Sequence, residues 1–200
     1  MEVRILHVSD IHCDTHRLVK VLEQEVYDFV VATGDFECVD TAEALLDKAK
    51  APLYAVTGNM DDPSVARVLR DAGVLLDGRI ATARGLTLAG VGGLDAAGSL
   101  TALKRKLGDT GGVDLLLSHH PPRGVLDKTF IGLRIGLREI RSLVAELRPR
   151  AHLFGHVHES RGMLELDGTL FVNAGPLMRG YYAVVVVEDG SWRAKLLHTH

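Results

Sequence analysis

Cysteine and tryptophan are scarce in this sequence. Its 200 residues include two cysteines, Cys13 and Cys38, and one tryptophan. The cysteines do not form a Cys-x-x-Cys pair, which excludes a structural zinc cluster built from thiolates. We expect both thiols to be reduced, as is usual in intracellular proteins.

The sequence also lacks long apolar runs and an excess of basic charge. Its most apolar run, residues 181–187, is far shorter than the roughly 20 residues that cross a membrane. The first ten residues, MEVRILHVSD, do not have the pattern of a signal peptide. The formal net charge is −3 and the pI is about 6.4, which disfavours a broad nucleic-acid surface. We therefore expect a cytoplasmic protein, with no membrane partner and no nucleic acid as its ligand.

Short apolar runs alternate with helical patterns, which is typical of α/β proteins with parallel strands. Five runs are predicted to be buried strands: residues 3–8, 29–32, 53–56, 115–117 and 152–154. Helices are expected between them. Asp14 is the predicted cap of the first helix, Asp40 with Glu43 resembles a capping box for the second, and Asp62-Pro63 begins the third. A further helix is predicted from about 134 to 147, before Pro149.

Closely spaced strands with turn residues between them indicate hairpins in the rest of the chain. Residues 80–83 and 86–89 flank Arg84-Gly85. Four more strands, at 163–166, 169–172, 182–187 and 192–197, are separated by Asp167-Gly168, Gly175-Pro176 and Asp189-Gly190. No linker or repeat is recognisable, so we expect a single domain over residues 1–200. We predict two packed sheets with helices on their outer faces.

Five polar blocks follow strand-like runs, and they carry the candidate chemistry. Parallel strands place their carboxyl ends at one edge, so we expect the blocks to converge. Their carboxylate, imidazole and amide groups suit Mn²⁺, Fe or Zn²⁺ better than Cu(I) or an Fe–S cluster. The blocks are Asp10-Ile11-His12, Gly34-Asp35, Gly58-Asn59-Met60-Asp61, His119-His120-Pro121-Pro122 and Gly155-His156-Val157-His158.

In this order, the blocks resemble those of the calcineurin-like metallophosphoesterase family. The resemblance spans positions 10 to 158 and implies a four-layer αββα sandwich with a dinuclear metal site. It implies that one metal is bound by Asp10, His12, Asp35 and His158. The second would be bound by Asp35, Asn59, His119 and His156. His119 is chosen over His120 because it directly follows its strand.

The resemblance also implies an activity. The protein is expected to hydrolyse small phosphate esters, more specifically phosphodiesters, by attack of a metal-bound hydroxide. Two divalent ions are the implied cofactor, with Mn²⁺ preferred and Fe, Zn²⁺, Ni²⁺ or Mg²⁺ as alternatives. Two other classes are weighed: a scaffold for protein interaction built on the same fold, and a nuclease. A complete set of ligand positions disfavours the first, and the short acidic chain disfavours the second.

The third block departs from the family pattern. Met60 stands where the family commonly has a histidine that assists the leaving group, and a thioether cannot donate a proton. His120 is the candidate catalytic substitute. The alternative is a structural role for His120 in its proline-rich loop. The sequence does not identify the residues that bind substrate, the substrate itself or the oligomeric state.

Overall fold

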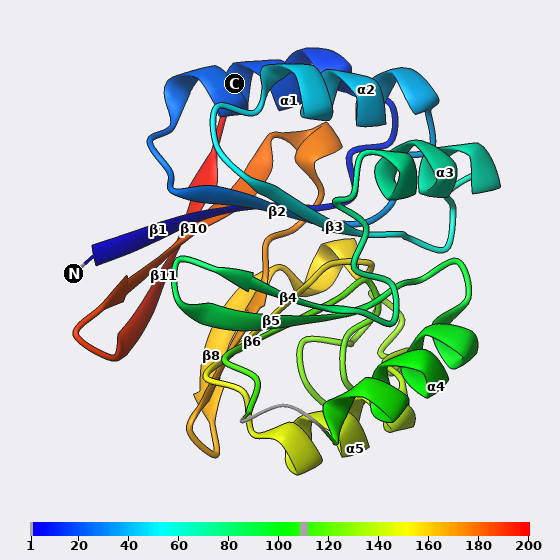
Figure 1. Cartoon of the computed structure of the whole chain (residues 1–200), viewed down its shortest axis with the longest axis vertical. Helices are drawn as coiled ribbons and strands as arrows, with labels where there is room; N and C mark the ends of the chain where they lie inside the picture. The colour runs from blue at the N-terminus through cyan, green and yellow to red at the C-terminus, as the bar shows by residue number, and fades with distance from the viewer. Residues whose placement is uncertain (1, 109–111) are drawn as a thin grey trace.

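Two β-sheets face each other in the computed structural model, which describes residues 2–108 and 112–200 (Figure 1). The five-stranded sheet has the order β11-β10-β1-β2-β3 and the six-stranded sheet the order β4-β5-β6-β7-β9-β8. Helices α1, α2 and α3 cover the outer face of the first sheet, and α4 and α5 cover that of the second. The predicted αββα arrangement of two mixed sheets is thereby confirmed.

The first half of the chain alternates strands and helices. β1 pairs in parallel with β2, and β2 with β3, while β1 pairs antiparallel with β10. The elements are β1 (Glu2–Val8), α1 (Thr15–Gln24), β2 (Phe29–Thr33), α2 (Val39–Lys48), β3 (Leu53–Val56) and α3 (Pro63–Asp71). The carboxyl ends of β1, β2 and β3 therefore lie at one edge of their sheet.

The second sheet repeats this arrangement. β5, β6, β7 and β9 run parallel, and β4 and β8 flank them antiparallel. Its elements are β4 (Ile80–Ala83), β5 (Leu86–Val91), α4 (Ala96–Leu107), β6 (Leu115–Ser118), α5 (Arg138–Leu147), β7 (Ala151–Phe154), the 3₁₀ turn η1 (His158–Ser160), β8 (Gly162–Leu166) and β9 (Thr169–Asn173). The chain then returns to the first sheet through the 3₁₀ turn η2 (Leu177–Arg179), β10 (Tyr181–Glu188) and β11 (Ser191–His198).

Three apolar layers hold the sandwich together. The middle layer lies between the sheets and includes Ile5, Phe29, Leu117 and Val185. One outer layer joins α1, α2 and α3 to the first sheet, and the other joins α4 and α5 to the second. Burial of apolar surface is the dominant favourable term in folding, so these layers fix the relative position of the sheets.

Local signals at several turns and helix ends are confirmed. Asp14 accepts a hydrogen bond from the Arg17 backbone N–H, and Asp62 caps α3 ahead of Pro63. The hairpin turns at 84–85, 167–168 and 189–190 each place a non-glycine residue and then glycine at positive φ, as type I′ turns require.

Three local predictions are wrong, and one helix was missed. The capping box is absent, because α2 begins after Cys38 and Asp40 already lies in its first turn. α5 begins at Arg138 rather than near 134, because residues before it form bridges within a loop. Gly175-Pro176 does not form a hairpin, since β9 and β10 belong to different sheets. Helix α4, capped by Asp95, was not predicted.

The expectation of two reduced cysteines is also wrong for this structure, which joins Cys13 and Cys38 in a disulfide. The two residues are 25 apart in sequence, yet their Cα atoms lie 5.2 Å apart. Both are held by the same carbonyl, because the backbone N–H groups of Cys13 and Cys38 donate to Phe36 O. The bond links the loop after β1 to the loop after β2.

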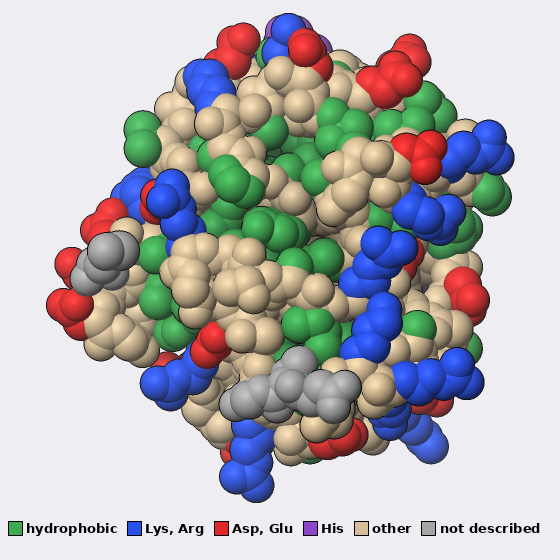
Figure 2. Space-filling model, in the orientation of Figure 1, with side chains coloured by type: hydrophobic (Ala, Val, Ile, Leu, Met, Phe, Trp, Pro, Cys, Tyr) green, Lys and Arg blue, Asp and Glu red, His purple; other side chains and the backbone are tan. Residues whose placement is uncertain are grey.

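The helices and the surface of the structure bear on the expectations drawn from the apolar runs and the net charge of the sequence. In the described residues, no helix is both long and apolar enough to cross a membrane. In Figure 2 the acidic side chains are scattered, and basic side chains gather along the right side of the face without covering it.

Candidate metal centre

The five polar blocks converge where strands of the two sheets end. Asp10 and His12 follow β1, Asp35 follows β2, and Asn59 follows β3. The second sheet contributes His119 after β6, together with His156 and His158 after β7. Hydrogen bonds join the loops directly, for example from the Asp10 N–H to Gly34 O and from the Gly155 N–H to His119 O. The topology therefore brings residues separated by almost 150 positions into one cluster.

The first group of possible metal ligands consists of Asp10, His12 and His158. One ligand atom from each lies within 4.8 Å of the others. His158 Nε2 is 3.2 Å from Asp10 Oδ1 and 3.3 Å from His12 Nε2. These separations are short enough for one ion to contact all three side chains.

The second group consists of Asp35, His119 and His156, again within 4.8 Å of one another. His119 Nε2 lies 3.2 Å from His156 Nδ1 and 3.4 Å from Asp35 Oδ2. Asn59 Oδ1 is 2.9 Å from the same nitrogen, so the amide oxygen also belongs to this group. The structure thus brings together every residue that was predicted for the second metal.

Asp35 lies between the two groups. Its Oδ2 is 3.4 Å from His119 Nε2 in one group and 3.9 Å from His12 Nε2 in the other. Its Oδ1 accepts a hydrogen bond from the Met60 backbone N–H, which orients the carboxylate. This position suits a carboxylate that bridges two ions.

Hydrogen bonds outside the cluster determine which imidazole nitrogens can bind a cation. Thr33 O can only accept, so His119 Nδ1 donates to it over 2.8 Å, and Nε2 is the nitrogen that offers a lone pair when the ring is neutral. His12 Nδ1 donates in the same way to Glu37 Oε1, 2.9 Å away. The lone pairs of both Nε2 atoms consequently face the cluster. Partners of this kind orient metal-bound histidines in proteins.

The donor set passes a chemical test for divalent metal. Donor atoms of carboxylate, imidazole and amide groups converge on two points, three or more at each. All of these group types bind divalent cations in proteins. Thiolates are absent from both groups, since Cys13 and Cys38 are bonded to each other. The residues therefore fit two divalent ions with hard or borderline character.

Glycine is required at two points where backbone approaches the ligands. A Cβ on Gly155 would lie 2.2 Å from Asp10 Oδ2 and 1.9 Å from Ser9 Oγ. A Cβ on Gly58 would lie 2.0 Å from Asp35 Oδ1. Any side chain at either position would displace a proposed ligand.

Backbone strain is concentrated in the same loops. Among the described residues, eleven non-glycine residues have positive φ, a conformation that costs free energy for most side chains. Six of the eleven belong to the loops of the metal centre: Asp10, His12, Cys13, Asp35, Glu37 and His156. Clustered strain of this kind marks functional sites.

The protonation states of the cluster follow from burial and from contacts. Burial raises the pKa of Asp10, but the hydrogen bond from His158 and the nearby imidazoles outweigh it and lower the pKa to about 2. Burial lowers the pKa of His156 to about 4, and the neighbouring His119 adds to this effect. Burial raises the pKa of Asp35. Asp10 is therefore ionised, and His156 is neutral, at pH 7.

His120 and Met60 lie beside the cluster rather than within either group. The His120 ring centroid is 4.5 Å from that of His156 and 5.2 Å from that of His119. Its Nδ1 is buried without a hydrogen-bond partner among the described residues. Burial lowers the pKa of His120 to about 3, so the ring is neutral at pH 7. The Met60 side chain is 58% exposed.

Other polar residues near the site support its loops. Asp61 accepts hydrogen bonds from the backbone N–H groups of Gly58 and Glu37, which ties two loops together. Asn173 donates to Val157 O and accepts from the Gly175 N–H, as expected for a structural residue. His7 is fully buried and pairs with Thr33 Oγ1, so it is a sheet residue and not a ligand.

Sequence reasoning missed the role of Glu37. The sequence places it only in a loop expected to set specificity, whereas its carboxylate accepts a hydrogen bond from His12 Nδ1. The available signal was an acidic side chain two positions after Asp35, in a loop next to a proposed ligand. An acidic residue at this spacing does not by itself predict a contact with His12. The positive φ of both Asp35 and Glu37, which directs the two side chains toward the cluster, is known only from the structure.

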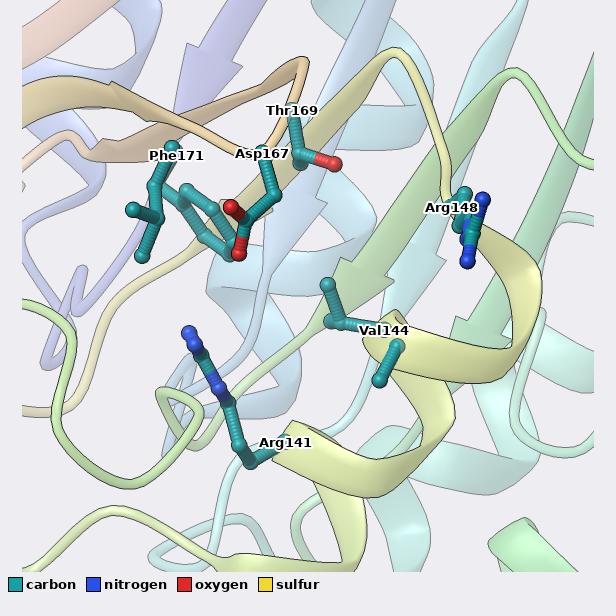
Figure 3. A pocket seen from close by; sticks show the side chains of 8 residues that line it. Arg141, Val144, Arg148, Asp167, Thr169 and Phe171 are labelled. Atoms are coloured by element: carbon teal, nitrogen blue, oxygen red, sulfur yellow. The ribbon is translucent and has the colours of Figure 1, made fainter.

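A separate pocket of about 370 Å³ lies outside the second sheet, between α5 and the β8–β9 hairpin (Figure 3). Arg141, Arg148, Asp167 and Phe171 are among the residues that line it. None of the proposed metal ligands belongs to this pocket. Because a carboxylate lies among its basic groups, it has no uniform charge for an anion, and we do not assign the activity to it.

Comparisons with known proteins show similarity to metallophosphoesterases. A human metallophosphoesterase domain-containing protein 1 is 39% identical over 75 residues, which cover 36% of this chain and 23% of that protein. A probable cyclic nucleotide phosphodiesterase of Synechococcus is 23% identical over 200 residues and covers 88% of this chain and 78% of its own length.

A structure described as a dimetal phosphatase from Danio rerio shares the fold, with a TM-score of 0.71 and 13% identity over 97% of this chain and 95% of that one. The model of the calcineurin-like phosphoesterase superfamily domain matches residues 3–190. The match covers nearly the whole sequence, and the chain therefore belongs to the calcineurin-like phosphoesterase superfamily.

Proposed function

We propose that this protein is a dinuclear metal-dependent phosphoesterase that hydrolyses phosphodiesters. The observation that carries the proposal is the pair of donor groups that meet at Asp35. Two bound divalent ions would polarise the phosphate oxygens and make a water molecule acidic enough to act as nucleophile at neutral pH. One ion would be held by Asp10, His12, Asp35 and His158, and the other by Asp35, Asn59, His119 and His156.

The charges of the site favour an anionic substrate. Two divalent ions bring four positive charges, and the bound carboxylates of Asp10 and Asp35 return only two negative ones. Glu37, which accepts the hydrogen bond from His12 Nδ1, adds one further negative charge beside the ligands and reduces the surplus to about one positive charge. The loaded site would keep a positive charge that attracts a phosphate ester.

A diester is favoured over a monoester by the Synechococcus relative, whose description is a probable cyclic nucleotide phosphodiesterase. A diester carries one negative charge, so a site with a small positive surplus can bind it without further basic side chains. Mn²⁺ is the proposed metal, because the donors are carboxylate, imidazole and amide groups without thiolate.

We also propose that His120 assists the leaving group in place of the family histidine that Met60 replaces, by a hydrogen bond from the N–H of its neutral ring and not as a protonated acid. Its ring packs against His156, and no proposed metal site uses it. The contribution of His120 should be largest for esters with poor leaving groups, which need most assistance. His120→Asn should then slow a methyl nitrophenyl diester less than a dialkyl diester. Equal activity of the variant and wild type on both would refute this role.

Metal stoichiometry and turnover together test the main proposal. The chelated protein would be reloaded with Mn²⁺, Mg²⁺, Zn²⁺ or Ni²⁺, the bound metal counted by mass spectrometry, and bis-nitrophenyl phosphate compared with nitrophenyl phosphate. We expect two ions per chain and faster turnover of the diester. Asp35→Asn should lose both ions, whereas the matched control Asp71→Asn, at an exposed helix end, should behave as wild type.

Three outcomes would contradict the proposal, each in a different part. Two bound ions without turnover of either ester would favour a scaffold that uses the fold for protein interaction. Failure to bind two ions would refute the dinuclear site itself. A strong preference for the monoester would retain the metal centre and replace the diester with a monoester as the substrate.

A further inference from the structure

A hairpin protrudes from the loop between β6 and α5. Lys128 and Arg134 form an antiparallel bridge at its base. At its tip, the Thr129 N–H donates to Leu133 O and the Gly132 N–H donates to Thr129 O. Gly132 has φ of +82°, which closes the turn. Residues 128–134, here named the Phe130 hairpin, therefore have a defined backbone.

The tip of this hairpin exposes large apolar side chains. Phe130 is 85% exposed, Ile131 81% and Leu133 58%. None of the three belongs to an apolar layer of the fold. Contiguous apolar side chains on a surface mark an interaction site, because single scattered ones are the normal condition.

Exposed apolar side chains are concentrated on the same side of the molecule as the metal centre. In the described chain, ten large hydrophobic side chains are exposed, and seven of them lie on loops that follow strand ends at this edge. These seven are Met60, Leu94, Phe130, Ile131, Leu133, Ile135 and Met178. The Met60 N–H donates to Asp35, and the Met178 N–H donates to Asp10 O.

Hydrogen bonds join the hairpin to η1, the turn that contains His158. The Phe130 N–H donates to Glu159 Oε1 at 3.0 Å. The Lys128 N–H donates to Ser160 Oγ, which in turn donates to Lys128 O. A surface that binds the hairpin would consequently face the metal centre.

Basic residues flank the apolar tip in sequence, and the acidic Glu159 contacts its backbone. The segment 121–139 has four basic residues and two acidic ones, a net charge of +2, in a chain whose net charge is −3. Asp127, one of the two acids, is buried and paired with Arg134. The basic residues are exposed: Arg123, Lys128, Arg134 and Arg138.

We propose that the Phe130 hairpin docks this protein on an anionic lipid surface. Phe130, Ile131 and Leu133 would enter the boundary between headgroups and acyl chains, and the basic side chains would contact anionic headgroups. The sequence excluded a spanning segment, but a tip of a few residues needs no such length. A second copy of the chain is a poorer partner, because a twofold contact would bring the basic residues of the two hairpins together.

Binding to vesicles tests this proposal without any measurement of ester hydrolysis. Wild type would be sedimented with phosphatidylcholine vesicles that contain or lack 30% phosphatidylglycerol, a composition chosen for about −1 charge per three lipids. We expect binding to the anionic vesicles that weakens as salt is raised. Phe130→Ser with Ile131→Ser should weaken it by about tenfold or more, because part of the apolar contact is removed.

A matched control separates the hairpin from general exposure of apolar groups. Val26 is 73% exposed but lies before β2, at the opposite end of the strands, so Val26→Ser should bind vesicles as wild type does. Phe130→Trp should shift its fluorescence to shorter wavelength when anionic vesicles are added, with wild-type Trp192 as the background.

Three results would overturn the proposal. One is the absence of binding to anionic vesicles at low salt. Another is binding that the double substitution leaves unchanged while thermal unfolding confirms a folded variant. The third is a wild-type dimer in sedimentation velocity that the same substitution dissociates, which would assign the hairpin to a second copy of the chain.

Discussion

Removal of the Cys13–Cys38 bond gives a prediction with a magnitude that follows from the structure. The bond closes a loop of 25 residues. Loop closure of this length lowers the entropy of the unfolded chain by about 12 cal/mol/K, or about 3.5 kcal/mol at 25 °C. A chain of 200 residues has an unfolding entropy of about 0.42 kcal/mol/K at its midpoint, so reduction should lower Tm by about 8 °C.

Thermal unfolding followed by circular dichroism measures this shift. Protein would be melted with a chelator, so that metal does not contribute, and with or without a phosphine reductant. Cys13 is exposed, so the reductant can reach the bond. The Cys13→Ser, Cys38→Ser variant is the control, and its Tm should match that of reduced wild type and not respond to the reductant.

If Tm does not change on reduction, titration of free thiols distinguishes two explanations. Two free thiols in denatured, unreduced protein would show that the bond does not form and would refute the structure at this point. If the bond forms but its reduction leaves Tm unchanged, the reasoning from loop entropy is refuted. The folded protein would then have to gain as much free energy on reduction as the unfolded chain does.

Two further predictions concern buried histidines and the partner of His12. Burial lowers the pKa of both His7 and His152 to about 3, so in the acidic range the unfolded chain binds protons that the folded protein excludes. The free energy of unfolding should therefore fall as pH drops below the unfolded pKa of 6.5, by about 2 kcal/mol per histidine between pH 7 and 5. Urea unfolding at these two pH values measures the loss, and His152→Gln should make it smaller by the contribution of His152. Glu37→Gln should weaken metal binding by about 10- to 100-fold in calorimetry, because His12 loses its charged partner, while exposed Glu43→Gln leaves affinity unchanged. An unaltered affinity in the Glu37 variant would mean that the hydrogen bond does not orient His12 for metal.

Most of the metal centre could be predicted from the sequence because ligand type and strand position are both local properties. Asp10, Asp35, Asn59 and His119 each follow a short apolar run, and parallel strands bring such positions to one edge. Helix caps at Asp14 and Asp62 were predictable for the same reason, since each depends on a few adjacent residues.

Features that depend on contacts between distant segments were not predictable. Glu37 was missed as the partner of His12, because their hydrogen bond joins the loops of two different strands. The disulfide was missed because the spacing of Cys13 and Cys38 has no recognisable pattern until both loops meet at Phe36 O.

The sequence by itself determined the positions of most strands along the chain, the chemical nature of the donors and the family, all of which are encoded in short segments. Only the tertiary structure decided which nitrogen of each histidine faces the cluster, that Asp35 lies between two groups, and that the Phe130 hairpin stands exposed beside them. The physical reason is that hydrogen-bond direction and burial depend on neighbours that the fold supplies from far along the chain.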